Sequence, residues 1–442
     1  MGGSIIKSIG ALYFNLFTLG FTLLLDFYVF TGVKSLLKNK RKGFQKVVFI
    51  AFWVINILSY VITTLIRQKY SQFTGLFPYS FLLAIFFLWF MVKFVFVLWL
   101  IFNDLQAFLR YSVRSIYGFF TRKNKVIEVE NSFEKPQLEE KIGLSRSQFL
   151  LKTGTLIAAT PALAMSYGII SGAHDYRVRR EKIYLQNLPN SFNGFKIAQI
   201  SDIHAGSFWN KTAVFGGVEM LMKEKPDIIM FTGDLVNNTA AEMINYLTVF
   251  DKLKADFGVY SVLGNHDYGN YVSWNSEQAY QKNHSDLLRV HKNLGWNLLL
   301  NEHQIITQGN DSIAIIGVEN WSAHKRRFPT LGDVKKAKTG ADDAAVKILM
   351  SHDPTHWQAE ILPLYPDIDL TLSGHTHGMQ FGIETANFKW SPVKYLYKEW
   401  AGLYQSGKQY LYVNRGYGYL GYPGRFGILP EITILTLENS KV

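Results

Sequence analysis

The chain of 442 residues contains no cysteine. This absence excludes a disulfide-stabilised scaffold, a metal site built on thiolates and a cysteine nucleophile. Acidic residues are scarce in the first part of the chain: residues 1–180 carry 22 Lys and Arg against 8 Asp and Glu, a net charge of +14, whereas residues 181–442 carry 24 against 26. The second part has no basic stripe of the kind that binds nucleic acid, so we expect no nucleic-acid partner.

Long apolar runs are abundant in the basic first part. Three of them are nearly uncharged and about 20 residues or longer, enough for a helix to cross a bilayer core of roughly 30 Å: residues 8–33, 47–66 and 81–102. A fourth segment, 153–173, is alanine-rich and broken by Pro161, so it could span the membrane or could instead be a cleavable or interfacial segment. The sequence therefore predicts a membrane region over residues 1–177 with about four transmembrane helices.

The charges in the loops between these runs indicate how the chain is oriented in the membrane. Six Lys and Arg lie in the first loop, from Lys34 to Lys46, and eight lie in the third, from Arg110 to Arg146. By the positive-inside rule these loops are cytoplasmic and the N-terminus is outside. If the fourth segment spans, we expect a multi-pass protein of the cell inner (cytoplasmic) membrane with its C-terminal domain on the extracytoplasmic side. Residues 124–144 are polar and without periodicity, which predicts a linker.

Two ionisable residues, Asp26 and Lys93, fall inside the predicted spans. Charges at such depth are costly and often functional. Asp26 could instead sit at the headgroup level, and Lys93 could snorkel or face a polar neighbour. A mutual ion pair is a further alternative that the sequence leaves open.

From about residue 183 the pattern changes to short Ile- and Val-rich runs, which alternate with polar helical stretches and glycine-bearing turns. Such runs are typical of buried strands of a layered α/β sheet. The predicted strands are residues 196–201, 227–233, 258–264, 312–318, 345–351, 368–374 and 409–414.

Five of these predicted strands end in a cluster of Asp, Asn or His. Ligands bind at the carboxyl ends of strands in α/β sheets because the loops converge there. Each cluster alone could be a helix cap, a turn or a solvated loop, but five in succession favour one shared site. The clusters are Asp202 and His204; Asp234; Asn265, His266 and Asp267; His352 and Asp353; and His375 and His377.

The motifs D-x-H, G-D, G-N-H-D, a later H and G-H-x-H, in this order, resemble the calcineurin-like metallophosphoesterase superfamily. The resemblance covers roughly residues 183–442, and the layout is most similar to the bacterial membrane-anchored branch. It implies an α/β fold, a four-layer β-sandwich flanked by helices, with the catalytic domain over 178–442 behind the all-α transmembrane region. It also implies two divalent metal ions and attack on the phosphoester by a hydroxide that bridges them.

The resemblance also implies roles for individual residues. Asp202, His204 and His377 would hold the first metal, Asn265, His352 and His375 the second, and Asp234 would bridge the two. Oxygen and imidazole ligands without thiolate suit Mn, Fe or Zn. His375 and His377 are expected to point the same way from an extended segment, and the flanking glycines allow a close backbone approach.

A catalytic role is implied for His266, which would stabilise charge or protonate the leaving oxygen. Asp267 is expected to orient the other nitrogen of this imidazole, or else to be a plain loop cap.

The sequence features that could bind substrate are less specific than the metal-ligand motifs. Residues 381–412 interleave aromatics with lysines and could lie at a membrane surface, or could be an ordinary loop packed on the core. Arg415 and Arg425 are candidate substrate-binding residues that could reach a second phosphate, or could be plain surface arginines.

The sequence thus predicts a membrane-anchored phosphoesterase that hydrolyses a phosphodiester or pyrophosphate bond. The expected partners are the lipid bilayer and a phosphoester substrate that could be lipid-linked. The alternative is a catalytically weak metal-binding sensor or scaffold protein of the membrane.

Overall fold

The computed structural model describes residues 2–69, 79–121, 146–325 and 328–440. The chain divides into two compact units: residues 1–65 with 85–164, and residues 66–84 with 165–442. Each unit is described by itself. The predicted linker 124–144 lies outside the described residues.

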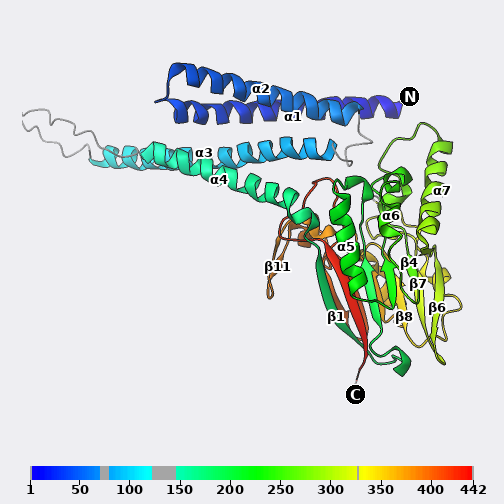
Figure 1. Ribbon diagram of the computed structural model, residues 1–442. Coiled ribbons are helices and arrows are strands. Elements are labelled where there is room, and N and C mark those ends of the chain that lie inside the picture. The colour runs from blue at the N-terminus through cyan, green and yellow to red at the C-terminus, as the bar shows by residue number, and fades with distance from the viewer. Residues whose placement is uncertain (1, 70–78, 122–145, 326–327, 441–442) are drawn as a thin grey trace, which may run out of the picture. The chain divides into compact units, whose positions relative to one another are not determined.

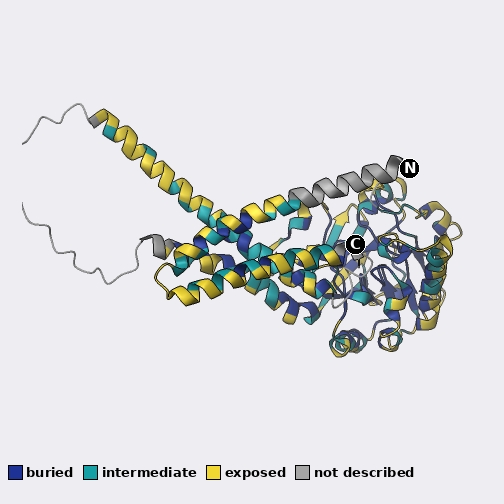
Figure 2. Ribbon diagram, turned by 90° about the horizontal axis from the view of Figure 1, so that it is seen from above, coloured by how far each residue is buried: buried dark blue, intermediate teal, exposed yellow. Residues whose placement is uncertain are grey.

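Four long helices fill the N-terminal region (Figure 1): α1 (Gly2–Leu37), α2 (Lys42–Lys69), α3 (Tyr79–Thr121) and α4 (Arg146–Ile170). All four are long and apolar enough to cross a membrane over part of their length, at Thr18–Leu37, Lys42–Ile66, Tyr79–Phe120 and Leu151–His174. Figure 2 shows much of their surface as exposed, and many of the exposed side chains are large and apolar, as expected of helices that face lipid.

Two features of these helices differ from the prediction. Helix α3 has 43 residues and continues well past residue 102, where we placed the end of the third span. Helix α4 runs through Pro161 without a break, so the predicted interruption is wrong. A proline is tolerated in a membrane helix because neighbouring groups satisfy the backbone atom that it frees.

The two predicted intramembrane charges form a buried ion pair between α1 and α3. The Lys93 Nζ lies 2.6 Å from the Asp26 Oδ1 and also donates to the Asn56 Oδ1 at 2.6 Å. The indole N–H of Trp89 donates to the same Asn56 oxygen at 2.9 Å. The mutual ion pair is therefore the alternative that the structure bears out, and neither charge is left unpaired away from water.

The C-terminal unit is built on two six-stranded mixed sheets. The first has the strand order β1 (Arg177–Leu185), β14 (Glu431–Asn439), β2 (Lys196–Ile200), β3 (Ile228–Phe231), β4 (Val259–Ser261) and β5 (Asn297–Leu298). The second has the order β12 (Gly402–Ser406), β13 (Gln409–Val413), β9 (Leu370–Ser373), β8 (Lys347–Met350), β7 (Asp311–Gly317) and β6 (Glu302–Gln308). A small hairpin, β10 (Ile383–Glu384) and β11 (Lys389–Trp390), stands apart from both.

The apolar core confirms a four-layer arrangement. Alternate residues of each strand face opposite sides of its sheet, so that Ile313 and Ile315 of β7 join the core between the two sheets while Ala314 and Ile316 face outward. The outer face of the first sheet packs against α5 (Lys211–Lys223), α6 (Leu247–Phe250) and α7 (Glu277–Leu294). The outer face of the second packs against α8 (Val334–Lys338) and the turns leading into α9 (Leu362–Leu364).

All seven predicted strands occur in these sheets. The long edge strand β1 and its parallel partner β14 were not among them. Strands β2, β3 and β4 run parallel in the first sheet, and β8, β9 and β13 run parallel in the second. The carboxyl ends of both sets carry the predicted motifs, and these ends meet at one place.

Candidate metal centre

One group of possible metal ligands comprises Asp202, after β2, with His204 in the same loop and His377 after β9. One ligand atom from each lies within 4.8 Å of the others, and all three residues are buried. The Asp202 Oδ1 lies 3.2 Å from the His377 Nε2. Asp202 also accepts the backbone N–H of His375 at 3.0 Å, which ties the loops of the two sheets together.

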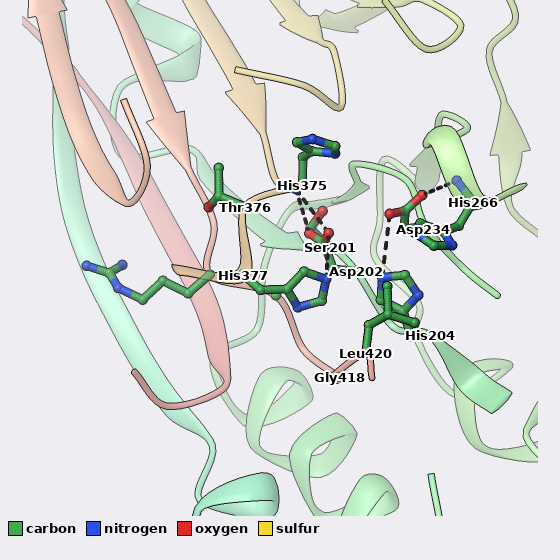
Figure 3. A network of polar contacts seen from close by, with 12 residues as sticks. Ser201, Asp202, His204, Asp234, His266, His375, Thr376, His377, Gly418 and Leu420 are labelled. Atoms are coloured by element: carbon green, nitrogen blue, oxygen red, sulfur yellow. Dashed lines mark hydrogen bonds and ion pairs between the residues drawn. The ribbon is translucent and has the colours of Figure 1, made fainter. Parts of the chain in front are cut away.

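A second group comprises Asp234, after β3, His352, after β8, and His375, after β9. The Asp234 Oδ2 lies 3.1 Å from the His352 Nε2, and the His375 Nδ1 lies 3.3 Å from the same His352 nitrogen. The Asp234 Oδ2 is also 3.5 Å from the Nε2 of His204, which belongs to the first group. Figure 3 shows Asp202 between His375 and His377, and Asp234 between His204 and His266. One carboxylate therefore faces both groups.

Among the residues that the structure describes, several polar atoms at this place are buried without a hydrogen-bond partner. They include the His204 Nδ1 and the Asn265 Oδ1. The Asn265 amide group donates to the Tyr271 hydroxyl at 2.8 Å, which leaves its oxygen as the unpaired atom. Buried polar atoms in folded proteins nearly always have a partner, and the unprotonated nitrogen of an imidazole and an amide oxygen each carry a lone pair that can bind a divalent ion. The residues present thus fit bound divalent metal.

The electrostatics of the cluster also favour bound positive charge. Burial would raise the pKa of Asp234, but the neighbouring His352 and His266 hold it well below its usual range. Burial opposes the charged form of His352, yet Asp234 and Asp202 raise its pKa to about 10. The two buried carboxylates therefore stabilise a positive charge, which is either the proton on His352 or a bound cation that displaces it.

The loop backbone is held in unusual conformations at this place. Asp202, His204, Asp234, His375 and His377 all have φ between +49° and +71°, a region that residues with side chains seldom adopt. Such conformations cost about 1–3 kcal/mol each and persist where surrounding structure enforces them.

The G-H-x-H motif is a tight turn, and the predicted extended segment is wrong. Between two histidines with positive φ, Thr376 has a helical conformation with φ −79° and ψ −23°. The turn directs the His375 side chain to the second group and the His377 side chain to the first. The expected close approach at Gly374 is confirmed, because a Cβ there would lie 2.0 Å from the Ser201 Oγ and 2.2 Å from the Asp202 Oδ2.

Neighbouring groups fix the orientation of the imidazoles. The carbonyl oxygen of Thr232 lies 2.7 Å from the His352 Nδ1, so that Nε2 faces Asp234. The Tyr397 hydroxyl lies 2.8 Å from the His375 Nε2, so that Nδ1 faces the second group. Such contacts around a metal site set the ring tautomer and direction. The sequence carried no signal for Tyr397, which lies in a loop 22 residues after His375.

The geometry corrects the expected pairing of His266 with Asp267. The His266 Nδ1 lies 2.8 Å from the Asn237 carbonyl oxygen, so the backbone holds the ring and Asp267 does not. Asp267 instead accepts backbone N–H groups, among them those of Gly264 at 2.9 Å and Asp234 at 2.8 Å. Asp267 therefore caps the loop, which was the alternative role that the sequence analysis left open. Burial and the nearby Asp234 raise the pKa of Asp267 to about 7.

Both candidate substrate-binding arginines have their guanidinium groups engaged within the domain. Arg415 contacts Glu431 at 2.5 Å and Glu384 at 2.7 Å. Arg425 donates to backbone carbonyl oxygens, including that of Gly418 at 2.8 Å, and one of its nitrogens lies 3.2 Å from the His377 Nδ1. These contacts favour a positioning role over substrate binding. The alternative of plain surface arginines is wrong, since both side chains are buried.

Comparison with known families agrees with the order of the motifs. Residues 195–379 match the family model described as "Calcineurin-like phosphoesterase". This part of the chain is a calcineurin-like phosphoesterase domain. Residues 11–173 match a second model, described as "Probable Calcineurin-like phosphoesterase, transmembrane domain". The phosphoesterase domain thus follows a transmembrane domain, and the chain is a membrane protein.

Similar proteins come from animals and bacteria. A zebrafish (Danio rerio) protein named "Transmembrane protein with metallophosphoesterase domain" is 29% identical over 331 residues, which are 74% of this chain and 70% of that protein. An uncharacterized metallophosphoesterase of Bacillus subtilis is 29% identical over 309 residues, 67% of this chain and 99% of that protein. Among solved structures, the NAD nucleotidase of Haemophilus influenzae has a TM-score of 0.35 and 17% identity, and the match covers 51% of this chain and 45% of that one.

The family-model match and the similar metallophosphoesterases, together with the two ligand groups, define the class of chemistry. The phosphoesterase domain belongs to a metal-dependent phosphoester hydrolase. Its ligand-bearing loops come from both sheets, so the site exists only when the two sheets are packed together.

Proposed function

We propose that the protein hydrolyses a phosphodiester or pyrophosphate bond at a centre of two divalent metal ions. The observation that carries this proposal is the position of Asp234, whose Oδ2 lies 3.5 Å from a histidine of one ligand group and 3.1 Å from a histidine of the other. A carboxylate between two such groups is the arrangement expected of a two-metal hydrolytic site.

In this proposal Asp202, His204 and His377 hold one ion, and Asn265, His352 and His375 hold the other. Asp234 bridges them. When bound, two ions of this kind supply a nucleophilic water at neutral pH and neutralise charge on the phosphoryl group. Mn, Fe and Zn all suit this set of oxygen and imidazole ligands.

The chain's own groups position the substrate around this centre. His266 keeps its Nδ1 on the Asn237 carbonyl oxygen, which can only accept, so the hydrogen lies on Nδ1 and Nε2 faces the substrate. The ring also packs against that of Tyr271, with centroids 4.5 Å apart, on the side of the Asn265 amide group. We place His266 at the leaving oxygen, to which its Nε2 donates once that nitrogen is also protonated, with the Nδ1–H kept on the Asn237 carbonyl oxygen. Asp267 is the residue that holds the loops of Asp234 and Gly264 in register.

The substrate is proposed to be lipid-linked or another component of the cell envelope. We assign residues 1–177 to the membrane region and 178–442 to the catalytic domain, and the start of β1 at Arg177 supports this boundary. The basic first and third loops support placement of the catalytic domain on the extracytoplasmic side of the inner membrane.

Metal content and hydrolysis test the proposal together. The full chain and Asp234→Asn would be purified in nanodiscs, and bound metal would be measured by mass spectrometry. Hydrolysis of a chromogenic bis-phosphodiester and of the matching phosphomonoester would be followed with Mn²⁺. We expect two ions per chain and metal-dependent cleavage of the diester in the wild type, and loss of both the second ion and the activity in the variant.

Asp286→Asn is the matched control, since Asp286 lies on α7 and pairs with the exposed basic side chains of Lys282 at 2.5 Å and Arg289 at 3.1 Å. It should keep both ions and full activity. Two bound ions without hydrolysis of a soluble or lipid-linked phosphoester would contradict the proposal and favour a metal-binding sensor.

A further inference from the structure

An exposed apolar patch lies in the C-terminal unit on the β10–β11 hairpin and the turn that follows it. Five large side chains, between 37% and 72% exposed, make up this hairpin patch: Phe381, Ile383, Phe388, Tyr395 and Leu396. Exposed apolar side chains gathered over one short stretch of chain usually mark a surface that contacts a partner or a membrane.

The hairpin patch is attached to the end of membrane helix α4. The Phe381 ring stacks on that of Phe426, with centroids 5.6 Å apart, and the Gly382 N–H donates to the Phe426 carbonyl oxygen at 2.9 Å. The preceding residue, Arg425, donates its backbone N–H to the Gly168 carbonyl oxygen in the last turns of α4 at 3.1 Å.

Small residues make this attachment close. A Cβ at Gly168 would lie 2.9 Å from the Arg425 carbonyl oxygen, and one at Gly172 would lie 1.9 Å from it. The Tyr422 hydroxyl also donates to the Met165 carbonyl oxygen. The loop thus packs directly on the end of a segment that is apolar enough to span the bilayer. The end of such a span lies at the bilayer surface, and the loop packs directly on that end.

The charges around the hairpin patch suit anionic headgroups. Lys394 and Lys398 are exposed beside it. Its acidic residue, Glu384, is held by Arg179 and Arg415, each at 2.7 Å. Apolar rings flanked by exposed lysines are typical of surfaces that enter the headgroup region of a membrane.

We propose that the hairpin patch docks into the surface of the same bilayer that α4 crosses, with its lysines on anionic lipid headgroups. The hairpin follows directly on the turn that carries His377, so docking sets the metal centre at the level of the headgroups. This last consequence rests on the proposed function and identifies the substrate class as a phosphoester that remains in the bilayer during catalysis.

The absence of native cysteine gives a direct test. Leu396→Cys and Phe388→Cys would each carry a nitroxide label in the full chain, reconstituted into vesicles of phosphatidylethanolamine and phosphatidylglycerol. Collision with oxygen, which concentrates in lipid, would be compared with collision with a water-soluble nickel complex. We expect the ratio to shift toward oxygen at both positions, and to shift less in vesicles of phosphatidylcholine alone.

Leu364→Cys is the matched control, since Leu364 is 63% exposed and Leu396 is 59% exposed. Its label should remain water-accessible. A Leu396 label as water-accessible as the Leu364 label would overturn the docking, and so would dipolar broadening between Leu396 labels, which would show a second copy on the patch. The measurement needs no turnover, so its failure is distinct from failure of the proposed function.

Discussion

Tyr397 shows how a residue outside the ligand groups controls one of them. Its hydroxyl lies 2.8 Å from the His375 Nε2 and fixes the ring with Nδ1 toward the second group. Tyr397→Phe removes this contact and keeps the aromatic ring, so we expect metal affinity or activity to fall by about 10–100-fold with little loss of folding stability. Isothermal titration calorimetry with the metal ion measures the change in metal affinity.

Tyr395→Phe is the control for this prediction, because Tyr395 lies two residues away with its side chain exposed. It should bind metal as the wild type does. Equal metal affinity in both variants would show that Tyr397 only packs against the histidine.

Gly374 lies where the fold leaves no space for a side chain. Gly374→Ala would place a Cβ 2.0 Å from the Ser201 Oγ and 2.2 Å from the Asp202 Oδ2. We expect a loss of stability of about 1–3 kcal/mol, as for overpacked cores, and a loss of metal binding. Gly216→Ala on α5 is the control, because nothing lies within 4 Å of its Cβ and alanine favours a helix by about 0.5–1 kcal/mol. Thermal unfolding compares the two, and a Gly374→Ala variant as stable as the Gly216→Ala variant would contradict the prediction.

At the residue scale the sequence predicted which side chains meet but not how they are held. The motif residues could be named because each follows an apolar run that forms a buried strand, and the carboxyl ends of these strands meet at one place. The contact of His266 with the Asn237 carbonyl oxygen could not be foreseen, since any backbone carbonyl nearby in the fold can accept it. Likewise, the positive φ at His375 and His377 depends on the packing of two loops that are far apart in the chain.

At the scale of elements, the Lys93–Asp26 pair links α3 to α1. Lys93 also donates to the Asn56 side chain, which links α3 to α2. Removing one partner leaves a buried charge without compensation, whereas removing both leaves an apolar contact. We therefore expect Lys93→Met to lower the thermal stability of the protein in detergent more than the double variant Asp26→Leu/Lys93→Met does. Lys46→Met, at an exposed position, should change little. Equal losses in the single and double variants would contradict this expectation, because removing Asp26 as well would then relieve no uncompensated charge.

The elements themselves were predictable to different extents. The seven central strands were evident because they are buried on both faces and read as continuous apolar runs. β1 and β14 pair in parallel across more than 240 residues of sequence, and no local pattern carries such a partnership. The break expected at Pro161 did not occur, since α4 continues through it.

For the whole molecule, the orientation in the membrane decides which substrates can reach the metal centre. The chain has no cysteine, so a single introduced cysteine is the sole target for a thiol reagent. Lys40→Cys lies in the exposed connection between α1 and α2, and Lys408→Cys lies in the exposed turn between β12 and β13. We expect a membrane-impermeant maleimide to label Lys408→Cys in intact spheroplasts, and to label Lys40→Cys only after the membrane is opened.

The physical reason lies in the basic residues of the first and third loops, which favour the cytoplasmic side and leave the parts after the second and fourth helices outside. Labelling of both variants after permeabilisation is the control for accessibility. If Lys40→Cys reacts in intact spheroplasts and Lys408→Cys does not, the catalytic domain faces the cytoplasm. Candidate substrates would then be phosphoesters of the inner leaflet, and the docking of the hairpin patch would hold on that leaflet instead, because it depends only on the end of α4.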